Sequence, residues 1–184
     1  MGKGSERMRL VPVTDAEFDG VFAEMENNFI REERRDREAA RALLREPRYT
    51  FFHVEDEGER VGFVTLWRLD DTTFVEHFVT YEKYRNRGVG RRVMSLLADS
   101  YGSLVLEAEH PETEMAARRL GFYGRCGFYQ NDLPYLQPPY REGGDGVPLI
   151  LLSYPAPLSD PRATARELYQ TVYRRPYEEY GPNQ

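Results

Sequence analysis

The segment with the most chemical character is a loop rich in arginine and glycine that joins an expected strand to an expected helix. The strand covers residues 72–80, and the loop at residues 85–90 has the pattern Arg-x-x-Gly-x-Gly. The first turn of a helix exposes unpaired backbone N–H groups and a partial positive charge, and glycines let a phosphate approach that backbone closely. The loop therefore predicts a pyrophosphate site, although it fits neither the dinucleotide-binding motif nor the P-loop motif. The alternative interpretation is a turn before a solvated, arginine-rich helix.

Two carboxylates share one face of a strand further along the chain. Alternation within residues 104–109 places Glu107 and Glu109 on one face and three apolar residues on the other. A helix is expected at about residues 113–123, with Tyr123 near its end and a glycine turn behind it. The sequence thus offers two acids and a phenol at the ends of neighbouring elements.

These segments, taken together, resemble the GNAT superfamily of acyl-CoA-dependent N-acetyltransferases. The loop at residues 85–90 matches its (Gln/Arg)-x-x-Gly-x-(Gly/Ala) pattern, and Tyr123 with Gly127 and Phe128 matches its Tyr-x-x-x-Gly-Phe element. The resemblance covers roughly residues 61–128. The ordered pair of motifs is far more specific than either motif alone.

The resemblance implies an α+β fold, with a mixed, mostly antiparallel sheet of about seven strands flanked by helices and with a splayed central strand pair. It also implies acetyl-CoA as co-substrate, with its pantetheine along the strand and its pyrophosphate in the loop. Many relatives carry an asparagine about seven residues before the tyrosine, where this chain has Ala116, so that contact is not expected. The residues implied to bind acetyl-CoA are Phe78, Val79, Thr80, Arg85, Asn86, Arg87, Gly88, Val89, Gly90 and Arg91.

Acetylation of an amine needs a neutral nitrogen, whereas an alkyl amine with a pKa near ~10.4 is protonated at pH 7. By the resemblance, Glu107 is the preferred base, acting through a water, and Glu76 on the neighbouring strand is the alternative. Either could instead be a solvated or ion-paired carboxylate. Tyr123 is the expected acid, because a tyrosine with a pKa of ~10 is uncharged at rest and can protonate the CoA thiolate; its alternative is a core aromatic. His77 is expected to alternate away from Glu76 and to pack, and Cys126 to act as a small hydrophobe.

The acceptor is predicted to be a cationic amine. Glu76, Glu107 and Glu109 are expected to form an acidic pocket with walls from Tyr135 and Tyr140. The net charge of −6 favours cationic small molecules and counts against nucleic acid. The predicted function is direct transfer of acetyl from acetyl-CoA to a primary amine of a small molecule. An acyl-CoA-binding regulatory module without turnover and a protein or peptide N-acetyltransferase remain as alternatives.

The elements that must position these residues follow from spacing. Thr14 and Glu17 have the spacing of a capping box, and apolar residues recur at steps of three and four as far as Phe29. Residues 31–45 are predicted to continue as a helix with a solvated charged face. A three-stranded antiparallel meander is expected at residues 49–80. Further expected elements are a helix after the glycine loop, strands at residues 103–108, 128–135 and 149–154, and a last helix from Pro161.

The 184 residues are expected to form one domain, residues 1–184, with a tail at residues 1–7 and a C-terminal helix and tail at residues 155–184. Apolar runs fall far short of the ~20 residues of a membrane span, and no export signal is evident. A cytoplasmic protein with no membrane or nucleic-acid partner is therefore expected, with a homodimer left open. One cysteine and three scattered histidines predict neither an internal disulfide nor a metal site.

Overall fold

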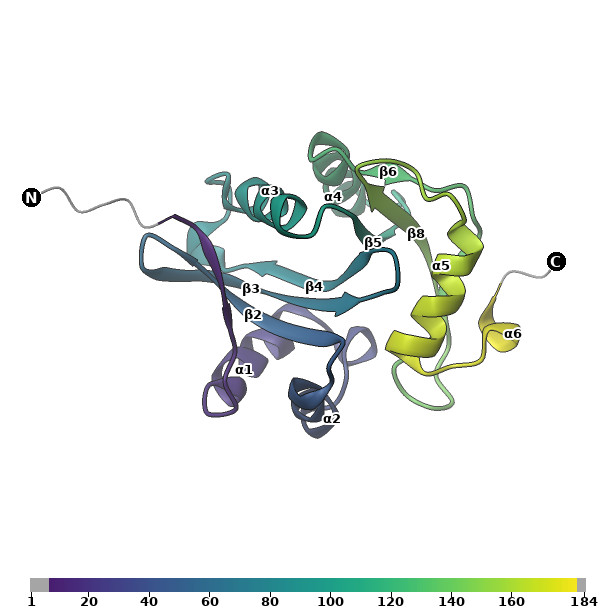
Figure 1. Ribbon diagram of the computed structural model, residues 1–184, viewed down its shortest axis with the longest axis horizontal. Helices are drawn as coiled ribbons and strands as arrows, with labels where there is room; N and C mark the ends of the chain where they lie inside the picture. The colour runs from purple at the N-terminus through teal and green to yellow at the C-terminus, as the bar shows by residue number, and fades with distance from the viewer. Residues whose placement is uncertain (1–6, 182–184) are drawn as a thin grey trace, which may run out of the picture.

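An eight-stranded sheet forms the frame of the protein in the computed structural model, which describes residues 7–181 (Figure 1). The strand order is β1-β2-β3-β4-β5-β8-β6, and β7 also pairs with β8. Every pair is antiparallel except β4 with β5, so the predicted mixed, mostly antiparallel sheet is confirmed. The strands are β1 (Arg9–Pro12), β2 (Tyr49–Asp56), β3 (Glu59–Arg68), β4 (Thr73–Thr80), β5 (Leu104–Glu109), β6 (Tyr129–Gln130), β7 (Tyr135–Gln137) and β8 (Val147–Tyr154).

Helices cover both faces of the sheet. Apolar residues of α1, α2 and α5 pack on one face, and those of α3 and α4 pack on the other (Figure 1). None of the helices within residues 7–181 has the length and apolar character needed to cross a membrane. The helices are α1 (Phe18–Asn28), α2 (Arg37–Ala42), α3 (Val89–Tyr101), α4 (Glu114–Arg125), α5 (Pro161–Glu167) and α6 (Tyr177–Tyr180), with 3₁₀ turns at Arg31–Glu33, Leu43–Arg45 and Glu82–Tyr84.

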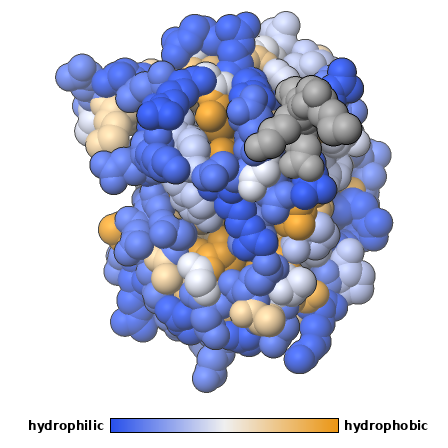
Figure 2. Space-filling model, turned by 90° about the vertical axis from the view of Figure 1, so that its left-hand side faces the viewer, coloured by the Kyte–Doolittle hydropathy of each residue, from blue (hydrophilic) through white to orange (hydrophobic). Residues whose placement is uncertain are grey.

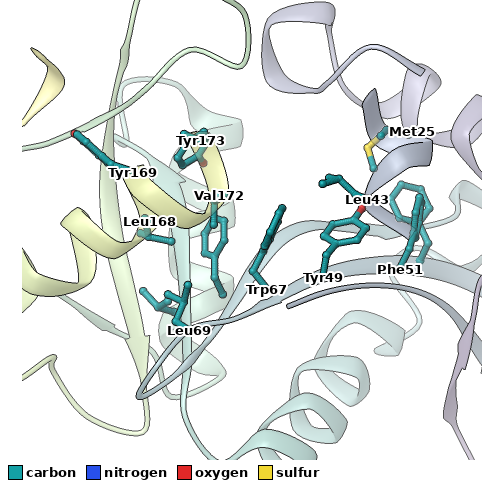
Figure 3. Packing of buried hydrophobic residues seen from close by; sticks show 14 of the residues in the cluster. Met25, Leu43, Tyr49, Phe51, Trp67, Leu69, Leu168, Tyr169, Val172 and Tyr173 are labelled. Atoms are coloured by element: carbon teal, nitrogen blue, oxygen red, sulfur yellow. The ribbon is translucent and has the colours of Figure 1, made fainter. Parts of the chain in front are cut away.

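The C-terminal segment is fixed to the sheet by an apolar face of its own. A π-helical stretch, Leu168–Tyr173, continues α5 and buries Leu168, Tyr169 and Val172 almost completely. Full burial of an aliphatic side chain such as Leu168 stabilises the fold by roughly 1.5–3 kcal/mol. Figure 3 shows these residues beside the layer that Met25, Leu43, Tyr49, Phe51 and Trp67 form on the same face of the sheet.

The central strands β4 and β5 separate after three residue pairs. Thr73 to Val75 pair with Leu104 to Leu106; beyond this point β4 continues along β3, and β5 continues along β8. The splayed strand pair is thereby confirmed. The edges of β4 and β5 beyond residues 75 and 106 are unpaired on the side of the opening, which interrupts a sheet that is otherwise continuous.

A β-bulge at Glu76 sits at the start of the opening. Val75 lies opposite Leu66 and His77 lies opposite Thr65, so Glu76 has no residue of its own opposite it on β3. The extra residue cancels one step of the strand alternation. The prediction that His77 alternates away from Glu76 is therefore wrong, because both side chains lie on the α1 side of the sheet. The prediction that His77 packs is confirmed, since the residue is only 5% exposed.

The charged stretch at residues 31–45 is not one solvated helix. It breaks after Glu33 and resumes only at Arg37, and Asp36 is in an extended conformation. Arg35 falls in this break, and its side chain turns inward with only 13% exposure. The physical reason is a charge inside the protein: Glu76 is buried, and a buried carboxylate requires a partner.

The strand expected at residues 128–135 is replaced by two short strands, β6 and β7. Asn131 interrupts the ladder, because its side chain donates to Leu151 O and Ser153 Oγ and accepts from the Leu158 N–H. Pro134 has no N–H to give to a ladder. The tail expected at residues 1–7 lies outside the described residues except for Arg7, and of residues 155–184 the structure describes those up to Gly181, including the expected helix.

Candidate active site

A cleft of about 1360 Å³ opens where β4 and β5 diverge. Its walls come from α1, β4, the segment before α3, β5 and α4. The splay thus brings residues that are far apart in the sequence to one opening. The predicted site residues in its lining are Glu76, Phe78, Val79, Thr80, Arg85, Glu107, Glu109 and Tyr123.

The glycine loop at residues 85–90 reaches α3 through left-handed backbone. Gly88 precedes the first residue of α3 with φ of +73°, and Asn86 has φ of +59°. A Cβ added to Gly88 would meet no atom within 4 Å, so open space lies beside the exposed N–H groups of the first turn. The loop is at the end of the molecule drawn on the left in Figure 1, and that surface is mainly hydrophilic (Figure 2). This arrangement can accept a phosphate group.

The arginines around the loop differ in whether their side chains are held by hydrogen bonds. Arg85 is tied inward, because its Nε donates to Thr80 O at 3.0 Å and its Nη2 donates to Asn28 Oδ1 at 2.9 Å. It thereby fastens the loop to β4 and α1. Arg87 and Arg91 are exposed, and no hydrogen bond to another described residue holds either side chain. These two guanidinium groups are therefore available for an anionic ligand.

Glu107 is held by three neutral donors. Tyr135 donates to Oε1, while Gln137 Nε2 donates to Oε2 at 2.8 Å and the Tyr173 hydroxyl donates to Oε2 at 2.6 Å. Burial raises the pKa of Glu107 to about 7, despite the three hydrogen bonds, and the negative charge of nearby Glu76 acts in the same direction. A carboxyl group with this pKa can both take up and release a proton near neutral pH.

Glu76 is an ionised carboxylate whose charge is balanced by Arg35. Its Oε1 accepts from Arg35 Nη1 at 2.5 Å and from the Tyr140 hydroxyl at 3.0 Å, and its Oε2 accepts from Trp67 Nε1 at 2.8 Å. Burial raises the pKa of Glu76, but the Arg35 charge and the hydrogen bonds outweigh it and hold the pKa below its usual value. Glu76 and Glu107 lie on the same face of the sheet in opposite electrostatic surroundings.

Tyr123 approaches the cleft from the other face of the sheet. Its ring packs edge-on against Phe122 and Phe128, at centroid distances of 5.3 and 5.7 Å. Burial raises the pKa of Tyr123 to about 12, so the hydroxyl keeps its proton throughout the neutral range. The cleft is therefore lined by a carboxyl group that titrates near neutral pH on one face of the sheet and by a protonated phenol on the other.

The sequence model of the acetyltransferase (GNAT) family matches residues 17–128. The chain belongs to the GNAT family. GNAT enzymes use acetyl-CoA as co-substrate, so the protein is an acyltransferase. A protein from Bacteroides thetaiotaomicron assigned to the GNAT family is similar to it at 32% identity and a TM-score of 0.85, over 90% of this chain and 98% of that one.

Two further acetyltransferase structures share the fold at lower identity. A dodecameric spermidine N-acetyltransferase from Vibrio cholerae superposes with a TM-score of 0.59 at 12% identity, over 80% of this chain and 92% of that one. An acetyltransferase from Thermus thermophilus does so with a TM-score of 0.59 at 15% identity, over 83% of this chain and 99% of that one. At these identities the likeness shows the fold alone. No curated protein matches the chain.

Three residues that hold the carboxylates of the cleft were missed by sequence reasoning: Arg35 at Glu76, and Gln137 and Tyr173 at Glu107. Gln137 and Tyr173, together with Tyr135, supply every side-chain hydrogen bond to Glu107 among the described residues, and all three lie beyond the segment that the family model matches. No short motif marks them, because each contact joins residues 28 or more positions apart. The one available signal was the need of a buried acid for a partner.

The three residues predicted to bind the acceptor, Glu109, Tyr135 and Tyr140, occupy different positions around the cleft. Glu109 lines the cleft and pairs with Arg119 at 3.2 Å. Tyr135 and Tyr140 do not line the cleft; they stand behind Glu107 and Glu76 as hydrogen-bond donors. Within residues 7–181, no group of three or more His, Cys, Asp or Glu side chains could hold a metal ion.

Proposed function

We propose that the protein transfers the acetyl group of acetyl-CoA directly to a primary amine of a small molecule, with Glu107 as the base and Tyr123 as the acid. The observation that carries this proposal is the contrast between the two carboxylates. Three neutral donors hold Glu107, and its pKa rises to about 7, whereas Arg35 neutralises Glu76. Of the two, only Glu107 exchanges a proton in the range where an enzyme works.

The glycine loop supports the acetyl-CoA part of the proposal. The unpaired N–H groups at the start of α3, the open space beside Gly88 and the two exposed guanidinium groups of Arg87 and Arg91 fit a pyrophosphate. Phe78 and Thr80 line the cleft between the loop and the carboxylates, which suits the narrow pantetheine chain. When bound, acetyl-CoA supplies an activated acetyl group as a thioester.

The proton balance of the reaction assigns one step to each residue. A protonated amine first loses one proton to solvent through Glu107. The remaining N–H bond breaks as the C–N bond forms, and Glu107 Oε accepts that second proton directly or through a water. The C–S bond breaks at the same carbon, and Tyr123 Oη gives its proton to the sulfur. The products are an amide and free CoA thiol, and both residues return to their starting states when a proton passes from Glu107 to Tyr123 through solvent.

The charge of the cleft supports a cationic acceptor. The lining has six acidic residues and three basic ones; once Glu76 is paired with Arg35 and Glu109 with Arg119, four acidic residues remain against two basic ones. Positive acceptors are attracted to such a surface, and their approach is faster at low salt. The acidic residues are Glu24, Glu33, Glu76, Glu82, Glu107 and Glu109, and the basic ones are Lys83, Arg85 and Arg119.

The proposal is tested by measuring CoA release from acetyl-CoA with a panel of amines, followed by mass spectrometry of the product. Cationic diamines and aminoalkyl compounds should be acetylated faster than amines that carry a carboxylate. Preference for anionic acceptors would reject the acceptor class, and acetyl-CoA binding without turnover of any amine would instead indicate a regulatory module. Glu107→Gln should abolish turnover while leaving acetyl-CoA affinity near that of the wild type, since Glu107 lies away from the glycine loop.

A further inference from the structure

A second cavity, of about 260 Å³, lies behind the candidate active site. It is bounded by the segment from Arg35 to Leu43, by Tyr140 and Arg141, and by Val172 to Arg175. Figure 3 shows Leu43 on one side of this space and Val172 and Tyr173 on the other. No described residue lines both this cavity and the cleft between β4 and β5. It is therefore a separate site.

Four arginines from three parts of the chain converge on this cavity. They are Arg35, Arg141, Arg174 and Arg175, and among residues 7–181 Asp36 is the only acidic residue in the lining. Such a concentration of guanidinium groups is unexpected on a protein with a net charge of −6. Arg174 has left-handed backbone, with φ of +54°, which a non-glycine residue adopts at an energetic cost. The cavity thus combines like charges with backbone strain.

Nearby carboxylates do not fully balance this charge. Arg35 pairs with Glu76 at 2.5 Å, Arg141 with Asp36 at 2.5 Å, and Arg174 with Glu46 at 3.2 Å. For Arg175, no ion pair with another of residues 7–181 is present. The four guanidinium groups thus have three carboxylate partners among residues 7–181, and Arg175 has none there.

The arginines also retain free hydrogen-bond donors. A guanidinium group has five N–H bonds. Arg35 donates one N–H to Glu76 and one to Val172 O, at 2.7 Å. Three of its five N–H bonds have no acceptor among the described residues and remain free for a ligand. Paired N–H donors match the oxygen atoms of carboxylates and phosphates in geometry as well as charge.

We propose that this cavity binds a small oxyanion. Its positive charge, its free guanidinium donors and its volume fit inorganic phosphate or a small dicarboxylate and disfavour an amine. Through Arg35, which pairs with Glu76, and Tyr173, which donates to Glu107, the bound anion would lie one residue away from both carboxylates of the acetyl-transfer site. The proposal does not depend on the proposed acetyl-transfer reaction.

The test is calorimetric titration of the full chain with inorganic phosphate, in a buffer free of other oxyanions. We expect saturable binding to the wild type and affinity at least about tenfold weaker for Arg175→Gln, because one charged donor is lost. Arg175→Lys, which retains the charge, should recover part of the affinity. Arg68→Gln is the matched control, since Arg68 is exposed on β3 and lines neither cavity, and it should bind as the wild type does.

Phosphate could also occupy the glycine loop, so each titration is repeated with saturating CoA. Binding that persists with CoA and weakens with Arg175→Gln supports the second site. The proposal is overturned if CoA abolishes the binding or if Arg175→Gln leaves it unchanged. It is also overturned if neither phosphate nor malonate binds saturably. A parallel titration with malonate identifies whether phosphate or a carboxylate is the better ligand. Circular dichroism of each variant verifies that it is folded.

Discussion

Replacing Tyr173 by phenylalanine isolates the control that the C-terminal segment exerts on Glu107. The hydroxyl of Tyr173 donates to Glu107 Oε2 at 2.6 Å, and its ring packs against Tyr140 at a centroid distance of 5.3 Å. Tyr173→Phe keeps the ring and removes the donor. Because the hydrogen bond stabilises the ionised carboxylate more than the protonated acid, its loss raises the pKa of Glu107 above about 7.

The size of the shift follows from the strength of the bond. A hydrogen bond to a charged group is worth ~1.5–3 kcal/mol, and one pKa unit corresponds to ~1.4 kcal/mol. Tyr135 and Gln137 continue to hold Glu107, so we expect about one unit, at the lower end of this range. At pH 7 the ionised fraction of Glu107 then falls from about one half to about one tenth, and kcat/KM falls about fivefold. Well above pH 8 the variant and the wild type should converge.

The assay is the pH profile of kcat/KM for a good amine acceptor between pH 5.5 and pH 9.5, in buffers of constant ionic strength. Tyr177→Phe is the matched control, because Tyr177 is a buried tyrosine of the same segment whose hydroxyl has no hydrogen-bond partner among the described residues. Its profile should overlay that of the wild type. An activity loss in Tyr173→Phe that is equal at every pH would refute the assignment, because it would indicate general damage to the site and no change in the base.

Three further predictions test the other parts of the site. Tyr123→Phe should lower kcat by ~10² to 10⁴ with little change in acetyl-CoA affinity, and full turnover would remove Tyr123 as the acid. Gly88→Val should weaken acetyl-CoA binding in calorimetry more than Gly88→Asn does, because asparagine tolerates the left-handed backbone there and valine does not. Glu76→Gln leaves Arg35 buried without its counter-charge and should reduce the free energy of unfolding by ~3–5 kcal/mol. The acidic limb of kcat/KM should remain in Glu76→Gln and move to lower pH, since the charge that raises the pKa of Glu107 is gone; disappearance of the limb would make Glu76 the base.

Short-range patterns were sufficient to predict most of the fold. The strand–glycine–helix junction, the alternation that turns Glu107 away from the apolar residues of β5, and the three-stranded meander each depend on neighbours within a few positions of one another. Local geometry decides such features, and a single sequence contains it. The cleft also contains Tyr123 and both carboxylates, as the resemblance implied, although their roles remain predictions.

The parts that sequence reasoning missed depend on contacts between distant residues. A bulge is a mismatch between two strands, so nothing in β4 alone indicates that Glu76 and His77 share a face. Among the arginines of residues 31–45, pattern alone could not identify Arg35 as the one that meets Glu76, 41 positions away. The same holds for Tyr173, which reaches Glu107 across 66 positions. A periodic pattern reports which face of an element is apolar, and gives no indication of which polar residue a distant segment will meet.

The location of the three donors to Glu107 divides the active site along the chain in a way that matters for its evolution. The glycine loop and Glu107 lie within the segment shared across the GNAT family, whereas Tyr135, Gln137 and Tyr173 lie after residue 128. Substitutions in the later segment can change the pKa of Glu107 without touching the glycine loop, and under the proposed function they would change the choice of amine as well. If the proposed roles hold, selection can act on acceptor chemistry and on acyl-donor binding as two nearly independent traits of one chain.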